Sequence, residues 1–229
     1  MNGAGGIWTV VLVALVGLGA WLVALGWPFL QTLSPETPPG QLLQIAETLA
    51  GAEDLDARVT LEGQGDEGVE VRLRYIAHPA IRIDVLKPEE LDGEVYTLRE
   101  IVDGWMLVHY RPREGAGVEI PVEGADWLTD LLDVGRLRAG LQLGRISVAS
   151  PEVGVLDIRG PPGPYHRLVI EKAPEDEDVL LTKVDVYSLK EEREVRIARA
   201  HILELELNQG IEFRELLSLP APPRRWFGG

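Results

Sequence analysis

The chain has 229 residues and a formal net charge of −15, from 37 acidic and 22 basic side chains. Nucleic-acid binding depends on neutralising phosphates with Lys and Arg, and the longest basic run is Arg224-Arg225, so the composition argues against a nucleic-acid partner. No cysteine is present, which excludes disulfides and thiolate metal ligands. The length is sufficient for one domain with a substantial core.

The N-terminal segment is apolar enough to cross a membrane. Residues 1–35 carry no charged side chain, and residues 6–30 are almost entirely apolar. About 20 apolar residues span a bilayer as a helix, and Trp8 and Trp27 lie near the two ends, where indole rings favour the interfaces. We therefore expect residues 1–30 to be a single-pass anchor in the cell (inner) membrane, the alternative being a cleaved secretory signal. The short, uncharged N-terminus favours a C-terminal domain on the periplasmic or extracellular side.

A proline-rich linker and a short helix follow the apolar segment. Residues 31–40 are expected to be semi-extended, and residues 41–229 to form the domain. Apolar residues at helical spacing predict an amphipathic helix over residues 40–51. Its apolar stripe is Leu42, Leu43, Ala46 and Leu49.

The following residues alternate with the period of two that is typical of strands with one buried face. In the first run Glu70, Arg72 and Arg74 share the polar face, and we expect them to form cross-strand ion pairs. Asp103-Gly104 between two β-prone runs predicts a hairpin, and Pro121 indicates an edge or a bulge. The predicted strands are residues 69–77, 81–85, 94–102, 105–110 and 118–122.

The periodicity changes once in the middle of the chain. Asp126 can cap a helix that runs to about Gly135 or a little beyond, with Trp127, Leu128, Leu131 and Leu132 on one face. Alternation then resumes, and the last strand is predicted from the shared parity of Val195, Ile197, Leu203, Leu205 and Leu207. Nine or ten antiparallel strands and two helices make an α+β fold with one large sheet. The later strands are residues 146–148, 153–158, 165–171, 180–188 and 195–207.

A sheet of this size with one polar face is expected to curl, which leaves an apolar concave face for the two short helices to cover. Incomplete cover would leave an apolar cavity, a natural site for lipid or acyl chains. A fully packed core is the alternative interpretation of the same pattern.

Several motifs occur in an order that is shared with one group of bacterial proteins. They are the helix QLLQIAETL followed by ARVTLEG, the strand pair YIAHPAIRIDVLKP, and the hairpin REIVDGWMLVHYRP with Asp103, Gly104, Trp105 and Tyr110 in matching places. The mid-chain helix DWLTDLLD and the ending LELELNQGIEFRELLSLPAPP complete the set. Over about residues 40–224 the chain thus resembles the LolA-like family of bacterial lipoprotein carriers, whose relatives include the periplasmic RseB-type regulators.

The resemblance implies a strongly curved antiparallel sheet, an open half-barrel, with two or three short helices over an apolar cavity that takes acyl chains. In this chain one transmembrane helix would precede that fold. The cavity would be lined by Leu73, Tyr75, Ile81, Ile83, Val85, Trp105 and Leu107. The lid would consist of Leu42, Leu43, Ala46, Leu49, Trp127, Leu128, Leu131 and Leu132.

The well-known carriers of the family are soluble shuttles, whereas an anchor would confine this chain to the membrane. We therefore expect a membrane-tethered envelope protein that binds lipid or lipoprotein acyl chains, for trafficking or sensing. The alternative is a regulatory or structural interaction protein of the envelope, with a packed core, a protein partner and no lipid ligand.

The sequence contains no recognisable motif for catalysis or metal binding. The four histidines, His78, His109, His166 and His201, show no zinc-ligand spacing, and no serine lies in a Gly-x-Ser-x-Gly elbow. We expect no enzyme activity, no metal and no cofactor. His109 shares a strand face with the predicted lining, and is expected to be a hydrogen-bonded structural residue or to lie at the rim of the cavity.

Overall fold

The computed structural model describes residues 34–63, 68–76, 80–101, 104–122, 134–161, 165–174, 180–220, 223 and 225–228. The predicted anchor, residues 1–30, lies outside the described residues. None of the described helices is long and apolar enough to cross a membrane. Four predicted lid residues also lie outside the described part: Trp127, Leu128, Leu131 and Leu132.

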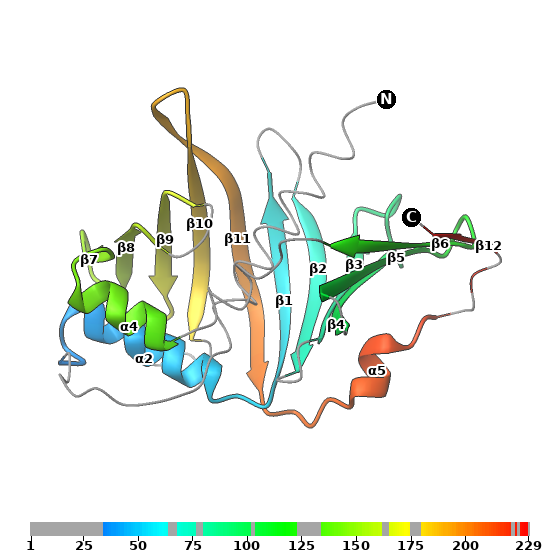
Figure 1. The fold of residues 1–229 in the computed structure, drawn as a ribbon, viewed down its shortest axis with the longest axis horizontal. Coiled ribbons are helices and arrows are strands. Elements are labelled where there is room, and N and C mark those ends of the chain that lie inside the picture. Colours follow the sequence, from blue (N-terminus) through cyan, green and yellow to red (C-terminus); the bar gives the residue numbers. More distant parts are fainter. Residues whose placement is uncertain are drawn as a thin grey trace. The chain divides into compact units, whose positions relative to one another are not determined.

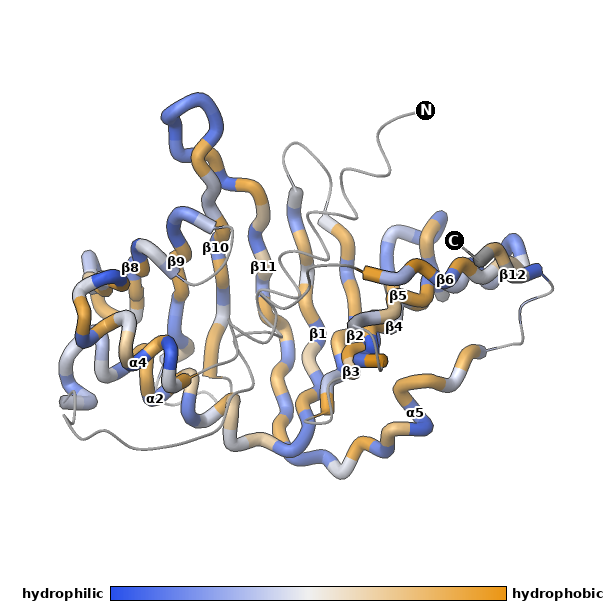
Figure 2. The backbone as a smooth tube through the Cα atoms, viewed as in Figure 1, coloured by the Kyte–Doolittle hydropathy of each residue, from blue (hydrophilic) through white to orange (hydrophobic). Residues whose placement is uncertain are grey.

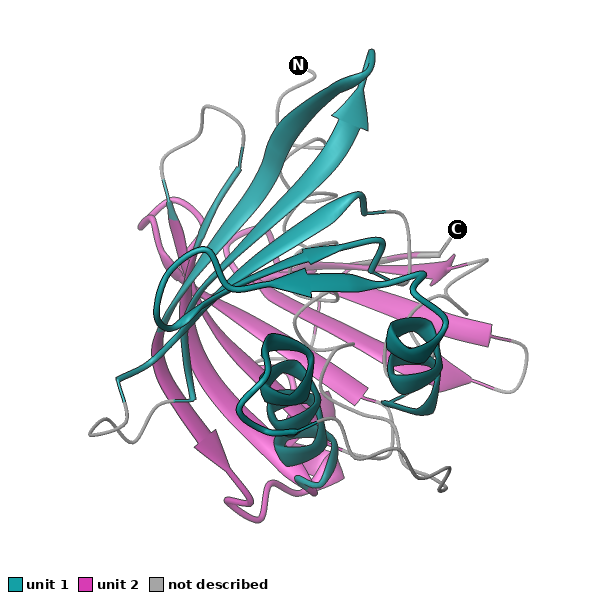
Figure 3. Ribbon diagram, turned by 90° about the vertical axis from the view of Figure 1, so that its left-hand side faces the viewer, with its two compact units in different colours: residues 1–52, 61–68, 126–202 teal, residues 53–60, 69–125, 203–229 magenta. Residues whose placement is uncertain are grey.

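Contacts divide the chain into two compact units, which Figure 3 shows in different colours. Unit 1 comprises residues 1–52, 61–68 and 126–202, and unit 2 comprises residues 53–60, 69–125 and 203–229. Two long strands, β1 (Asp54–Glu62) and β11 (Arg193–Leu207), contribute residues to both units.

Twelve strands are hydrogen-bonded in the order β12-β6-β5-β4-β3-β2-β1-β11-β10-β9-β8-β7. Neighbours are antiparallel from β2 to β6 and from β7 to β11, whereas β12 is parallel to β6. This mostly antiparallel sheet with few helices confirms the coarse α+β class. The strands of unit 2 are β2 (Val69–Ile76), β3 (Ala80–Lys87), β4 (Val95–Ile101), β5 (Gly104–Arg111), β6 (Ala116–Val122) and β12 (Arg225–Gly228). Those of unit 1 are β7 (Ser147–Ala149), β8 (Val155–Arg159), β9 (Arg167–Lys172) and β10 (Leu181–Lys190).

Helix α2 (Pro38–Ala50) begins two residues earlier than predicted, because the end of the expected linker caps it. The Oγ1 atom of Thr37 accepts a hydrogen bond from the backbone N–H of Gly40 at 3.3 Å. Prolines 38 and 39 occupy the first helical positions, where a missing N–H is tolerated. The predicted apolar stripe is buried, and within unit 1 the helix packs against α4 (Val134–Gln142) and β7 (Figure 1).

Helix α4 runs well past Gly135, near which the predicted mid-chain helix ends. Gly140 allows Ile146 to approach closely, because a Cβ at position 140 would lie 2.4 Å from Ile146 Cδ1. Arg138 forms an ion pair with Glu47 of α2. These contacts with other elements stabilise the helix, and periodicity within the segment does not reveal them.

Strands β2 to β5 confirm the predicted alternation. The expected cross-strand ion pairs are present: Arg72 lies 2.6 Å from Asp56, and Arg74 lies 2.6 Å from Asp84. Gly104 is the first residue of β5 and pairs with Ile101, so the prediction that placed Gly104 in the turn is wrong by one residue. Its φ of +131° is accessible to glycine alone without strain.

Strand β11 confirms the last predicted strand, but one parity does not hold along it. A bulge opposite Val186 and Tyr187 shifts the register and moves the buried positions to Ala198, Ala200 and Ile202. Leu203, which shares the predicted parity, is 47% exposed. A bulge inserts one unpaired residue and therefore reverses the faces beyond it.

The C-terminal segment of unit 2 is attached to the sheet by a carboxylate, an arrangement not predicted from the sequence. The side chain of Asp54 accepts hydrogen bonds from the backbone N–H groups of Gln209, Gly210 and Ile211 at 2.7–3.0 Å. Helix α5 (Phe213–Leu217) follows and buries Leu216 against β2 and β3. The chain then ends in β12, which pairs with the Ala116–Glu119 part of β6.

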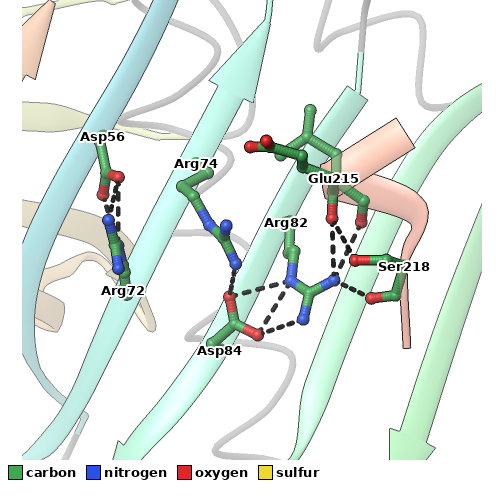
Figure 4. Close-up of polar contacts among 8 residues, drawn as sticks. Asp56, Arg72, Arg74, Arg82, Asp84, Glu215 and Ser218 are labelled. Carbon is green, nitrogen blue, oxygen red and sulfur yellow. Dashed lines mark hydrogen bonds and ion pairs between the residues drawn. The ribbon is translucent and has the colours of Figure 1, made fainter. Parts of the chain in front are cut away.

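Arg82 joins α5 to β3 (Figure 4). Its guanidinium donates to both carboxylate oxygens of Asp84 at 2.7–2.9 Å, and also to the backbone carbonyls of Glu215, Leu216 and Ser218. The last carbonyls of a helix lack partners within the helix, so Arg82 satisfies groups that would otherwise be unpaired. Burial alone would raise the pKa of Asp84, but hydrogen bonds from Arg82 and Arg74 hold that pKa below its ordinary value.

We predict that Arg82→Gln lowers the free energy of unfolding by about 3 kcal/mol, because it leaves a largely buried carboxylate and the end of α5 without their partner. The matched control is Arg159→Gln in β8. That side chain is 54% exposed, and its partner Glu194 retains Arg167. The control should change the free energy of unfolding by about 1 kcal/mol at most. Urea unfolding measures both; equal losses would contradict the role assigned to Arg82.

Candidate functional site

The seven predicted lining residues lie on one face of β2, β3 and β5 in unit 2. Residues that pair across neighbouring strands point to the same side of a sheet, so the registers define rows of side chains across the strands. One row is Leu73, Ile83, Tyr96, His109 and Val118, and the next is Tyr75, Ile81, Leu98, Leu107 and Ile120. Val85 and Trp105 lie on the same face, beyond these two rows on opposite sides. We call this surface the apolar face of unit 2.

Burial changes across the apolar face. Leu73 and Ile83 are fully buried, Leu107 is half-buried, and Ile120 of β6 is 44% exposed. The aliphatic surface therefore continues from a buried part on β2 and β3 to a solvent-accessible part on β5 and β6. An apolar surface that reaches solvent is a typical property of binding sites for apolar partners.

A polar cluster bounds the apolar face at one end. We call it the Glu94 cluster, and it consists of Glu94, Tyr96, His109 and Arg111. The Tyr96 hydroxyl donates to Glu94 at 2.8 Å, and His109 Nε2 lies 2.8 Å from the same carboxylate oxygen. The Tyr96 and His109 rings stack with centroids 4.0 Å apart, and Arg111 Nε is 3.9 Å from Glu94. His109 is thus a hydrogen-bonded residue at the border of the face, which combines the two roles expected for it.

Burial alone would raise the pKa of Glu94, but hydrogen bonds from His109 and Tyr96 hold the pKa of that carboxyl below its ordinary value. Glu94 is therefore ionised at neutral pH. Sequence reasoning missed Glu94, Tyr96 and Leu98 as residues of this face. The alternation in β4 contains the signal, because Glu94, Tyr96 and Leu98 share a parity, but assigning that parity to the apolar face requires the β3–β4 register.

Tyr75 differs from its neighbours on the apolar face by carrying a polar atom. Its side chain is 2% exposed, and its hydroxyl has no hydrogen-bond partner among the described residues. Burial raises the pKa of the Tyr75 phenol, so the hydroxyl remains protonated over the physiological pH range. The apolar face thus contains one neutral hydrogen-bond donor.

The described lid residues belong to unit 1. Leu42, Leu43, Ala46 and Leu49 are buried on α2, which packs against α4 and β7. Unit 1 also has an apolar sheet face of its own, which sequence reasoning left out of the candidate site. Apolar and polar residues alternate along β8 to β11 (Figure 2), and the buried apolar residues are Leu156, Ile158, Leu168, Ile170, Val184, Val186, Ala198 and Ala200.

The opposite face of unit 2 is charged and internally paired. A hollow of about 380 Å³ there is lined by Asp56, Arg58, Arg72, Leu86, Glu204 and Glu206. Arg72 pairs with Asp56, and Arg58 pairs with Glu70 at 2.5 Å and Glu204 at 3.5 Å. Because both arginines of the hollow have acidic partners, we interpret this face as a network of ion pairs.

Among the described residues, no group of three His, Asp or Glu side chains could hold a metal ion. His166 lies 3.2 Å from Glu194 and His201 lies 3.7 Å from Glu62, so each is placed beside one carboxylate. His78 lies outside the described residues.

No family model and no curated protein matches the chain. Three solved structures are similar to it in fold. An outer membrane lipoprotein-sorting protein domain from Vibrio parahaemolyticus is 12% identical with a TM-score of 0.42, over 76% of this chain and 95% of that one. A DUF1329 family protein from Desulfovibrio piger is 12% identical with a TM-score of 0.42, over 78% and 96%. A LolA superfamily protein from Nitrosomonas europaea is 8% identical with a TM-score of 0.35, over 72% and 89%.

The last of these structures bears the name of the family that the sequence motifs resemble. At identities of 8–12% such a likeness concerns the fold alone, and TM-scores of 0.35–0.42 are too low to transfer a function from one protein to another. The residues of this chain must therefore support any functional proposal.

We predict that Glu94→Gln removes a pH-dependent part of the stability. A carboxyl whose folded pKa is depressed stabilises the fold above its unfolded pKa, about 4.3 for Glu, and loses this effect as the pH falls through the folded pKa. The unmodified chain should therefore be more stable than Glu94→Gln at pH 6, and the difference should shrink below about pH 4. Urea unfolding at each pH measures it, with the exposed Glu114→Gln as control; a difference that grows on acidification would contradict the assignment.

Proposed function

We propose that the apolar face of unit 2 binds the acyl chains of lipids or lipoproteins, as part of a half-barrel domain held at the cell envelope. The apolar residues 6–30 would anchor the chain in the membrane, and the domain would lie on the periplasmic or extracellular side. The protein would act without catalysis, as a local acceptor, presenter or sensor of acylated molecules.

The continuity of the apolar face is the observation that carries the proposal. Across β2 to β6 one row contains Tyr75, Ile81, Leu98, Leu107 and Ile120, without a charged side chain. Its outer members are accessible, because Leu107 is half-buried and Ile120 is among the exposed large hydrophobic residues. An acyl chain gains binding free energy roughly in proportion to the apolar area it covers, and an unbroken aliphatic row supplies such area.

The polar surroundings support an amphiphilic ligand. The Glu94 cluster places a carboxylate and Arg111 at one border of the apolar face, so a ligand with an apolar chain and a polar end would find both environments on the same strands. Binding sites for small ligands commonly combine apolar walls with a few polar groups that orient the ligand.

We predict that Leu107→Glu weakens binding of a fluorescent fatty acyl ester to the purified full chain by at least tenfold. A charge in the middle of the row removes the contact of a leucine side chain, which is worth about 1.5–3 kcal/mol when fully buried. Fluorescence titration measures the dissociation constant. The matched control is Met106→Glu, which places the same charge on the adjacent residue of β5 and on the opposite face, and it should change the affinity less than twofold.

Circular dichroism and urea unfolding would establish that both variants fold. Equal binding by the two variants would contradict the use of this face. If the unmodified chain neither binds the probe nor carries co-purified lipid after purification without detergent, the face is a packed core. The alternative, an interaction protein of the envelope, would then explain the fold better.

A further inference from the structure

Tyr75 carries the one unsatisfied polar function of the apolar face among the described residues. Three buried side-chain atoms of the described chain lack a hydrogen-bond partner: Tyr75 Oη, Arg74 Nε and Arg99 Nε. The two arginines lie on the opposite, charged face, because Arg74 pairs with Arg82 and Arg99 pairs with Met106. The Tyr75 hydroxyl is therefore separate from the ion-pair network.

The surroundings of the hydroxyl are aliphatic. In its row Tyr75 is followed across the strands by Ile81 and Leu98, and along β2 its neighbour on the same face is Leu73. None of these side chains can accept a hydrogen bond. A buried hydroxyl without an acceptor is less favourable than the phenylalanine that would fill the same space, so its presence points to an acceptor supplied by a bound molecule.

We infer that Tyr75 donates a hydrogen bond to the neutral carbonyl oxygen of an ester- or amide-linked acyl chain bound on the apolar face. The inference rests on the proposed acyl binding and specifies the chemistry of the ligand. Tyr75 would act as a specificity-determining residue, selecting acyl groups in covalent linkage over hydrocarbons and over free carboxylates.

Charge decides between a carbonyl and a carboxylate. An ionised carboxylate buried without a cation carries a large desolvation penalty, and the row of Tyr75 contains only Ile81, Leu98, Leu107 and Ile120 beside it. The basic residue Arg111 of the same face belongs to the Glu94 cluster and pairs with Glu94 and Glu114. A neutral acceptor therefore fits the position of Tyr75 better than an anion.

The test compares three ligands of similar chain length on the full chain: methyl palmitate, palmitate and hexadecane. At neutral pH the unmodified chain should bind methyl palmitate most tightly. Tyr75→Phe should weaken methyl palmitate binding roughly 2- to 12-fold, the range of one neutral hydrogen bond, and leave hexadecane binding unchanged. The matched control is Tyr110→Phe, which removes the same atom from a buried tyrosine on the opposite face and should alter neither affinity.

Infrared spectroscopy gives a second readout that a purely structural role would not affect. The carbonyl stretch of carbon-13-labelled methyl palmitate should move to lower frequency when it binds the unmodified chain, because a hydrogen bond weakens the C=O bond. In Tyr75→Phe this shift should be absent. The measurement on the unmodified chain does not depend on how well a variant folds.

The outcomes separate this inference from the proposed function. Binding of methyl palmitate that is unchanged in Tyr75→Phe, without a carbonyl shift, would overturn the inference and leave acyl binding in place. Tighter binding of palmitate than of its methyl ester would overturn the choice of a neutral acceptor. If none of the three ligands binds the unmodified chain, the proposed function fails, and the inference fails with it.

Discussion

Side chains of successive residues in a strand point to opposite faces, and strands β2 to β5 use this constraint to separate charge from aliphatic surface. Arg72, Arg74, Arg82 and Asp84 all lie on one face, while Leu73, Ile81 and Ile83 lie on the other. Each face then imposes its own requirement. Charges must find partners, and the aliphatic side chains must be removed from water.

The charged face meets its requirement in part with backbone groups. Arg82 is 7% exposed and neutralises Asp84, and its remaining donors bind the carbonyls at the end of α5. A helix of five residues has little stability of its own, so α5 depends on Arg82 and on the burial of Leu216. Asp54 performs the reverse task by accepting three backbone N–H groups at the start of the same segment. Two buried charges thereby attach the C-terminal residues to the sheet.

Features determined within a few residues could be predicted from the sequence, and those determined by distant contacts could not. Alternation in β2 to β5 and the helical stripe of α2 are local, and both were found at nearly the right residues. Helix α5 and strand β12 exist through contacts with β2, β3 and β6, which no local pattern announces. The bulge in β11 illustrates the limit within a single strand, because one inserted residue reverses the parity that a period count assumes constant.

The candidate site was predictable to the same extent. The parity of β2, β3 and β5 placed Leu73, Ile83 and Leu107 on one face, as the registers do. The Glu94 cluster was not predicted, because it unites residues of β4 and β5 with a residue that precedes β4. Charged residues read as solvent-facing in a sequence unless their partner is known, and here the partner of Glu94 is a histidine fifteen residues away.

A packed core and a ligand-binding face are built from the same aliphatic residues, so burial does not separate them. Polar groups do. A core that evolves for stability alone should contain polar side chains that are paired, as those of the Glu94 cluster are, because a buried group without a partner costs about 1–3 kcal/mol. Tyr75 breaks this rule in the middle of the apolar face, where phenylalanine would occupy the same volume without that cost. A chain that retains such a hydroxyl gives up stability in its empty form, and a ligand with an acceptor at that place would restore it. The apolar face is thus better explained as an acyl-binding surface than as a completed core.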